Sequence, residues 1–448
     1  MSVIRPKPPD DPLHFDPLRG LAAGRTAPHG TPACARAHTP AHTRAVPADS
    51  AADVLAELVS EILAGFSAHL AELRDGIMSA AEVVLPARLL DDYTTPGRRS
   101  TSGLAAILAT ARRLRESVDR VIVVGDGCAA LAGRAVFESC AHPFHNELPR
   151  GERGGRPRIS WIDSSSGNDV VQGLLDLVAP AGSPPGRDLL AQWAVVATGP
   201  LAAAERTAAA TRLFVEPLLA NVGGDPTLRA ERLVTIAVPG SELAELATRL
   251  GGGVTCELPA GRAAETCPFT AATLLPAAVA GIDVVRLLEG AVAMNRRFAE
   301  APPETNPALG FAAVSLAAAG TGRELVLAPE GRQLGSIGRW HARREELAPP
   351  APLSARARSI VCGVTTAGRA IRVPLRSMRP IRDRLVVPPL PGAVAAGDAP
   401  TGQRFGNLGE DSPAPEAGGI CLPRIDEHAV GQVLELIHLA ALTAAVSR

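Results

Sequence analysis

Short β-branched runs alternate with helix-like segments along this chain, and that alternation restricts its fold more than any other feature. Strand-like runs occur at residues 121–124, 159–162, 194–197 and 233–238. Helical spacing of apolar residues is found between or after them, at 131–140, 170–177, 202–219 and 243–250. Repeated β–α units predict a parallel sheet with helices on both faces and right-handed crossovers.

The remainder of the chain is mainly helical before a second α/β unit begins. A helix is expected to start near Ser50, and three more are expected at 274–281, 284–298 and 307–319. The second unit starts with a strand at 324–328 and ends with an amphipathic helix at 427–445, after a proline- and glycine-rich loop at 388–416. We therefore expect five parts: a disordered arm (1–48), a helical segment (49–118), a first α/β domain (119–268), a helical connector (269–320) and a second α/β domain (321–448).

The N-terminal 48 residues hold nine prolines and four histidines with little apolar periodicity, which predicts a mobile arm. Cys34, His38 and His42 are spaced like metal ligands on one helix face, but Pro40 breaks such a helix. No fourth ligand stands close by, so no metal site is expected.

Composition excludes several classes of protein. The net charge of −1 gives no basic patch for nucleic acid, and no apolar run reaches the about 18 residues of a membrane-spanning helix. The first residues lack the apolar segment of a secretory signal. Seven widely spaced cysteines indicate reduced thiols in the cytoplasm rather than a disulfide framework. Lys7 is the only lysine, so no lysine is available to chemistry in the folded part.

The most informative turn follows the first strand-like run. Gly125, Asp126 and Gly127 separate that run from a helix pattern. A glycine turn at a helix N-terminus is how α/β proteins hold phosphate, because free N–H groups and the helix dipole converge there. Asp126 and Cys128 occupy positions where such a site favours small or hydroxyl-bearing residues.

Five blocks follow one another along this sequence: HNELPRGERGGRPRI, WAVVATGPLAAAERTAAATRLF, LLPAAVAGIDVVRLLEGAVAMNRRF, ELVLAPEGRQLGSIGRW and LPRIDEHAVGQVLELIHLA. In this order they resemble the glucose-6-phosphate isomerase family, especially bacterial forms with an HNELSR-RGG-PRI segment. The resemblance implies two sugar-isomerase (SIS) domains, each a three-layer α/β/α sandwich. It also implies a cytoplasmic homodimer, hexose 6-phosphate as the ligand, a place in glycolysis and gluconeogenesis, and no cofactor.

The same resemblance implies where phosphate would bind. The family's first loop, Gly-Ile-Gly-Gly-Ser, falls on residues 125–129, which makes Gly125 and Gly127 candidate substrate-binding residues without the serine hydroxyl. Its second loop, rich in serine, lysine and threonine, falls on Gly199, Pro200 and Leu201. Thr207 matches the last threonine of that loop and is the third candidate.

The groups that perform the isomerisation are also altered. The family's arginine in Gly-Gly-Arg-x-Ser corresponds to Glu265, and Arg262 substitutes only if the loop shifts by three residues. The family's catalytic glutamate corresponds to Leu347, and Glu346 is one residue short, a rotation of about 100° on a helix. Glu346 and Arg262 are thus the candidate catalytic residues of an active enzyme. No histidine lies between His341 and His428, although the family has one there, and His428 is expected to cap or pack.

Three hypotheses remain from the sequence. The first is a folded isomerase homologue with little or no activity, which pairs with itself or with a related isomerase. The second is an active isomerase that uses Glu346 and Arg262. The third is a sugar-phosphate-binding regulatory or scaffold protein. The family's lysine-bearing tail is expected to be missing, because the sequence ends at Arg448.

Overall fold

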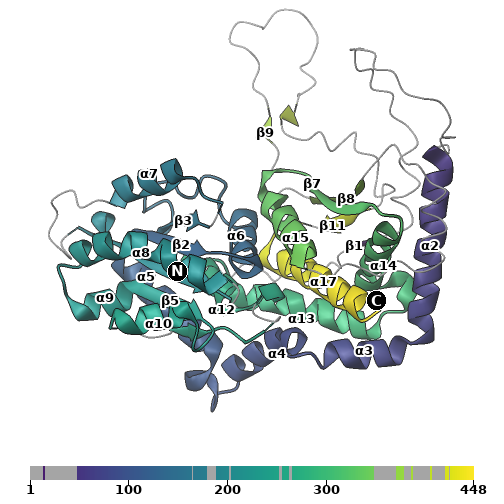
Figure 1. Cartoon of the computed structure of the whole chain (residues 1–448), viewed down its shortest axis with the longest axis horizontal. Helices are drawn as coiled ribbons and strands as arrows, with labels where there is room; N and C mark the ends of the chain where they lie inside the picture. Colours follow the sequence, from purple (N-terminus) through teal and green to yellow (C-terminus); the bar gives the residue numbers. More distant parts are fainter. Residues whose placement is uncertain are drawn as a thin grey trace, which may run out of the picture.

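The computed structural model describes residues 48–163, 165–178, 188–200, 203–251, 255–261, 265–347, 370–377, 419–422 and 424–447, with short strands at 14–15, 385–386 and 404–405. These residues form two main sheets, each with helices packed against it, and further helices join the two (Figure 1). Arg262, the Cys34–His42 segment and most of the expected loop at 388–416 lie outside the described residues.

The first sheet has five parallel strands in the order β3–β2–β4–β5–β6. The strands are β2 (Arg120–Gly125), β3 (Arg158–Ile162), β4 (Trp193–Gly199), β5 (Leu233–Ala237) and β6 (Cys256–Glu257). The helices that connect them are α6 (Cys128–Cys140), α7 (Asn168–Val178), α8 (Ala204–Asn221), α9 (Pro226–Arg232) and α10 (Glu242–Arg249). The four predicted strands are confirmed, and the two-residue β6 is an addition.

Alternating burial along β2 explains the layers of this domain. Val121 and Val123 belong to the core formed with α6, α5 (Gly103–Ser117) and α12 (Ala271–Val279). Ile122 and Val124 belong to a separate core with α7, α8 and α10. Both faces of the strand are buried, as the apolar run predicts for a covered parallel sheet. The expected three-layer α/β/α arrangement is present in this domain.

The second sheet has the order β1–β11–β8–β7. Its strands are β1 (His14–Phe15), β11 (Ile420–Leu422), β8 (Ala370–Ser377) and β7 (Glu324–Pro329). β7, β8 and β11 are parallel, whereas β1 is antiparallel and adds an edge strand from within the segment predicted to be an arm. A separate ribbon pairs β9 (Leu385–Val386) with β10 (Arg404–Phe405), and of these two strands only β10 lies inside the stretch 388–416 that was expected to be a loop.

The remaining helices run around and between the two sheets. Helix α2 stands along one edge of the molecule, and α3 and α4 continue beneath it toward the first domain (Figure 1). Their bounds are α2 (Ala48–Ala68), α3 (Leu70–Met78), α4 (Ala81–Thr94), α13 (Val284–Glu300), α14 (Pro307–Gly320), α15 (Gly335–Leu347) and α17 (Glu427–Val446). Short 3₁₀ turns are η2 (Arg99–Thr101), η3 (Leu189–Ala191), η5 (Pro303–Thr305) and η6 (Arg332–Leu334).

Helix α17 differs from its sequence-based prediction. It was expected to be amphipathic, but every residue from Ala429 to Ala440 is buried, including Glu435 and His438. Among the described helices it alone has the length and apolarity to cross a membrane unaided, and α2 with α3 reaches that length only across an 80° bend. Because α13 and α14 pack against α17 and bury most of it, α17 is a core helix.

Two glycines let α13 and α17 approach closely. A Cβ on Gly290 would lie 2.1 Å from the carbonyl oxygen of His428, and one on Gly431 would lie 2.0 Å from that of Leu287. Each helix therefore presents a backbone carbonyl where the other lacks a side chain. Any larger residue at either position has to push the helices apart.

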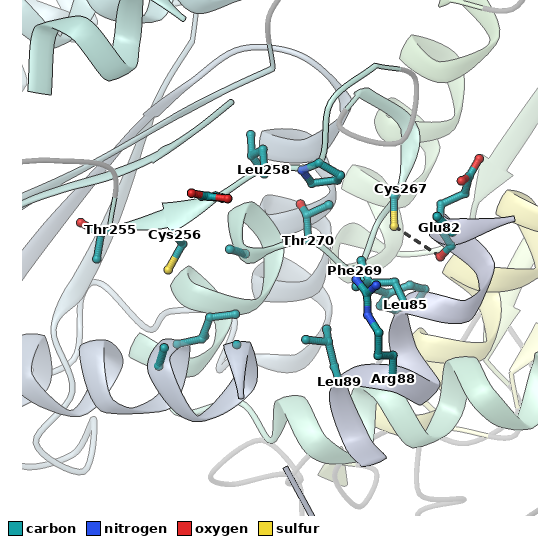
Figure 2. A pocket seen from close by; sticks show the side chains of 17 residues that line it. Glu82, Leu85, Arg88, Leu89, Thr255, Cys256, Leu258, Cys267, Phe269 and Thr270 are labelled. Carbon is teal, nitrogen blue, oxygen red and sulfur yellow. Dashed lines mark hydrogen bonds between the residues drawn. The ribbon is translucent and has the colours of Figure 1, made fainter. Parts of the chain in front are cut away.

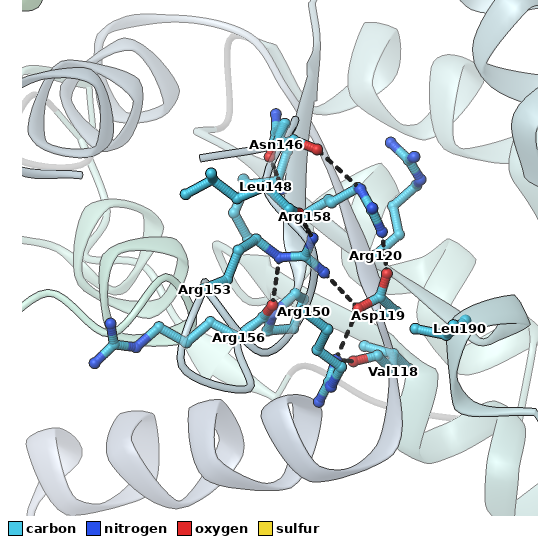
Figure 3. Close-up of polar contacts among 12 residues, drawn as sticks. Val118, Asp119, Arg120, Asn146, Leu148, Arg150, Arg153, Arg156, Arg158 and Leu190 are labelled. Atoms are coloured by element: carbon cyan, nitrogen blue, oxygen red, sulfur yellow. Dashed lines mark hydrogen bonds and ion pairs between the residues drawn. The ribbon is translucent and has the colours of Figure 1, made fainter. Parts of the chain in front are cut away.

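The arginine-rich HNELPRGERGGRPRI segment folds onto one carboxylate at the start of β2. Asp119 is 1% exposed and is ion-paired with Arg150 (3.0 Å), Arg153 (2.5 Å) and Arg158, as Figure 3 shows. The same arginines donate to backbone carbonyls, for example Arg150 to Val118 at 2.8 Å. This network fastens the loop between α6 and β3 to the N-terminal end of the sheet. We call it the Asp119 network.

Candidate functional site

The glycine turn lies at the C-terminal end of β2, as predicted. Gly127 has φ 88° and is the N-cap residue of α6, without a side-chain cap. Gly125 packs against β4, because a Cβ there would lie 2.6 Å from both the side chain and the carbonyl of Thr198. Gly127 is thus required by its positive φ, and Gly125 by its close packing. The α6 N-terminus that follows this turn favours anions.

Asp126 gives this turn a negative charge that is partly neutralised. The residue is 7% exposed, and its Oδ2 lies 3.2 Å from Nε of Arg206 on α8. Because half of the Arg206 side chain is exposed, solvent weakens this ion pair. The turn therefore presents a carboxylate and an arginine together, rather than a bare cluster of donors.

The neighbouring turn after β4 offers few donors. Pro200 packs on the first turn, since a Cβ on Gly127 would lie 3.6 Å from its Cγ. Thr207 is buried, and among the described residues its hydroxyl has no hydrogen-bond partner. That hydroxyl lies beneath Gly199, whose added Cβ would meet it at 2.9 Å.

The C-terminal half of α15 faces the same place. Burial raises the pKa of Cys128 to about 11; the charges of Arg344 and Arg343 lower it, and those of Glu265 and Glu346 raise it. These four charged groups are therefore near enough to Cys128, in the first turn of α6, to affect its pKa. A buried thiol with a raised pKa stays protonated at neutral pH and is a poor nucleophile.

Glu346 itself is a surface residue. Its side chain is 63% exposed, and its Oε2 accepts a hydrogen bond of 2.5 Å from Arg343 of the preceding turn. That hydrogen bond and the charge of Glu346 raise the pKa of Arg343, although partial burial opposes them. The pair belongs to one helix, so it does not bring opposite walls of a cleft together.

A buried polar group lies behind Arg343, at the contact of α15 with α17. Arg344 donates to the carbonyl of His438 at 3.2 Å, and burial lowers the pKa of its guanidinium. Burial raises the pKa of Glu435 to about 8, against the opposing effects of Asn295 and Arg344. Burial also lowers the pKa of His341 to about 4. At neutral pH this buried group thus combines a charged arginine with neutral partners.

No family model matches the sequence, but several curated proteins with one name are similar to it. The glucose-6-phosphate isomerase of Rubrobacter xylanophilus is 31% identical over 228 residues, which cover 51% of this chain and 49% of that protein. The glucose-6-phosphate isomerase of Acetivibrio thermocellus is 27% identical over 210 residues, or 47% and 44% of the two chains. The chain spans about half the length of the curated relatives it matches.

Solved structures extend the likeness to most of the fold. A hypothetical protein, TT0462 from Thermus thermophilus, has a TM-score of 0.60 at 19% identity, covering 87% of this chain and 92% of that one. A glucose-6-phosphate isomerase from Chlamydia trachomatis has a TM-score of 0.50 at 13% identity, covering 76% and 68%. At these identities the likeness concerns the fold alone.

Over about half of its length the chain is thus similar to curated glucose-6-phosphate isomerases. Of the residues that the isomerase resemblance singled out, Gly125, Gly127 and Thr207 all lie at the C-terminal edge of the first sheet. Glu346 lies near Cys128, at the same edge. Arg262 is outside the described residues, and the roles of all five stay predictions.

Sequence patterns did not single out the arginines beside these two turns. Arg206 is in the first turn of α8, and Arg343 and Arg344 are near the end of α15. The order of the strands could have indicated Arg206. Because β2 and β4 are adjacent, the turns that follow them lie side by side. His428, in contrast, pairs with Gln432 one helical turn away, at 3.0 Å, which fits its expected role in packing.

Proposed function

We propose that this protein is a cytoplasmic glucose-6-phosphate isomerase homologue with little or no isomerase activity. The observation that carries the proposal is the state of Glu346. It is the only carboxylate that the resemblance offers as a base on α15, and it is largely exposed and paired with Arg343. A base that moves a proton between two carbons needs hydrogen-bond reach to substrate in a site that excludes water.

The charge around the first turn of α6 supports the same proposal. Glu265 stands where the family has its arginine, and its negative charge reaches Cys128. Isomerisation passes through an anionic enediol, which a nearby carboxylate destabilises. At about 4 Å this repulsion is worth roughly 1 to 4 kcal/mol in partly solvated surroundings. Leu347, at the position of the catalytic glutamate, cannot exchange a proton.

The decisive experiment is an isomerase assay of the purified protein. Fructose 6-phosphate is supplied, and glucose 6-phosphate is detected through an NADP-linked dehydrogenase. We expect a rate indistinguishable from the blank. Turnover near about 10 per second, typical of enzymes, would refute the proposal.

An active enzyme is the second candidate, and one observation favours it. Glu346, Arg343 and Arg344 all lie near the α6 N-terminus, so α15 supplies both a carboxylate and cations to the site. In that case Glu346→Gln abolishes the measured turnover, whereas Glu345→Gln on the same helix leaves most of it.

A binding role without turnover is the third candidate. The α6 N-terminus and Arg206 are suited to an anion, and hexose 6-phosphate is the ligand that the family suggests. Fructose 6-phosphate at millimolar concentration then raises the melting temperature, and Arg206→Gln reduces that rise. The oligomeric partner in this case is a second copy or a related isomerase, which size-exclusion chromatography with each candidate distinguishes.

A further inference from the structure

A cavity of about 460 Å³ lies beside β6 at the edge of the first sheet (Figure 2). Helices α4 and α5 form one side, and the residues after β6 and the start of α12 form the other. Its volume is in the range of small-molecule sites, about 300 to 1,000 Å³. None of the residues singled out as candidate catalytic or phosphate-binding groups lines it.

Most of the wall is apolar. Leu85 and Leu89 project from α4, and Leu258 and Phe269 face them from the opposite side (Figure 2). Ile107 of α5 also lines the cavity. A ligand that fits this wall has an apolar body, because its transfer from water onto these side chains is favourable.

One end of the cavity is an uncapped helix N-terminus. Thr270 is the N-cap residue of α12, yet its side chain caps no amide of that helix. Its hydroxyl is buried, with the residue 2% exposed, and has no hydrogen-bond partner among the described residues. The backbone N–H groups of Ala271 and Ala272 likewise have no hydrogen-bond acceptor among the described residues. An unpaired buried hydroxyl costs stability, so packing alone does not account for Thr270.

The charges at the cavity limit the ligand further. Arg88 is exposed, forms no ion pair within the described residues, and rises beside Phe269 in Figure 2. Glu82 also lines the cavity, but its carboxylate points away from Thr270, and its backbone carbonyl accepts from Cys267 at 3.8 Å. Glu257, the second acidic residue of the lining, is exposed. One arginine without an ion pair among the described residues and one helix N-terminus suit a single negative charge.

We propose that this cavity binds a small monocarboxylate with an apolar body, its carboxylate at Thr270 and the α12 N-terminus. The apolar body lies against Leu89, Leu258 and Phe269, and Arg88 covers the mouth. The proposal concerns a site separate from the isomerase-like one and does not depend on whether the protein is an enzyme.

Three probes of equal chain length test the charge requirement: hexanoate, 1-hexanol and hexylammonium. Calorimetric titration and melting temperature are measured for each with the full-length protein. Hexanoate should bind most tightly, hexanol about tenfold more weakly, and hexylammonium least, because only hexanoate brings a negative charge to the α12 N-terminus and Arg88. Equal binding of hexanoate and hexanol, or no binding of hexanoate at tens of millimolar, would overturn the proposal.

Variants locate the binding. Thr270→Val keeps the volume, removes the hydroxyl, and should weaken hexanoate about tenfold while the free protein melts no lower. Ala106→Leu narrows the cavity and should weaken binding of hexanoate and hexanol alike. Arg88→Gln should weaken hexanoate only. The matched control is Arg112→Gln, an exposed arginine on α5 outside the cavity, which should change nothing. Unchanged hexanoate binding by Ala106→Leu would place any observed binding elsewhere and refute the site.

Discussion

Strand β2 of the first sheet has an aspartate next to each end, and the two aspartates differ in the arginines that pair with them. Asp119, just before β2, is enclosed by Arg150, Arg153 and Arg158. Asp126, just after β2, is ion-paired with the half-exposed Arg206. The charge type is the same, and the surroundings differ.

This difference shows how the sheet divides its tasks. At its N-terminal end, the buried charge of Asp119 fastens the loop between α6 and β3 to the domain. At its C-terminal end, where open α/β sheets bind ligands, the buried Asp126 is paired with an arginine whose side chain is half exposed. Three predictions test this contrast.

The largest effect is expected from Asp119→Asn. It leaves three arginines facing a neutral side chain, and losing one partner of a buried ion pair costs about 3 to 5 kcal/mol. Urea unfolding of the variant and the parent protein measures the cost. Glu116→Gln, which removes an exposed carboxylate paired with Arg112, is the control and should change stability by less than about 1 kcal/mol. Similar results for both variants would show that the Asp119 network is not structural.

The next effect is expected at Glu435, a buried carboxyl without an arginine clamp, and it approaches the first in size only near pH 8. Burial raises its folded-state pKa to about 8 from an ordinary 4.5, so the folded protein holds the proton more tightly than the unfolded chain. Its contribution to stability is therefore complete below about pH 4.5 and is lost as the pH rises to about 8.

Glu435→Gln should remove this dependence. The parent protein should lose up to about 1.4 kcal/mol per pH unit relative to the variant between about pH 5 and pH 8. Unfolding free energies of both proteins across that range give the comparison. Parallel curves would mean that Glu435 is ionised in the folded protein, with Arg344 as its partner.

The smallest effect is expected from Arg206→Gln. Because the pair with Asp126 is half exposed, its loss should cost less than about 1 kcal/mol. The measurement is the same urea titration used for Asp119→Asn. A loss as large as that of Asp119→Asn would remove the distinction between the two ends of β2.

Much of this architecture follows from the sequence. The strands at β2, β3, β4 and β5 were predictable because both faces are buried, which leaves continuous apolar runs. Gly125 and Gly127 marked the turn after β2, since that turn needs a positive φ and close packing. Such features are local, and each is encoded within a few residues.

Features that depend on distant partners were not predictable. Asp119 pairs with residues 31 to 39 positions away, and no periodicity encodes that choice. Helix α17 was misassigned because Glu435 and His438 suggest a solvent-facing side, whereas α13 and α14 cover it. Strand β1 was missed because two residues inside a proline-rich stretch give no pattern, and its pairing with β11 comes from the far end of the chain.

The glycine crossing of α13 and α17 has a consequence for the buried carboxyl one turn away. Gly431 contacts the Leu287 carbonyl in only one rotation of α17 about its axis. In any other rotation, a neighbouring residue with a larger side chain would clash with that carbonyl. Glu435 follows four residues later and shares that face. Because Gly431 has no side chain, α17 keeps the rotation that points the Glu435 carboxyl inward, away from water. Gly431 therefore contributes to the raised pKa of Glu435.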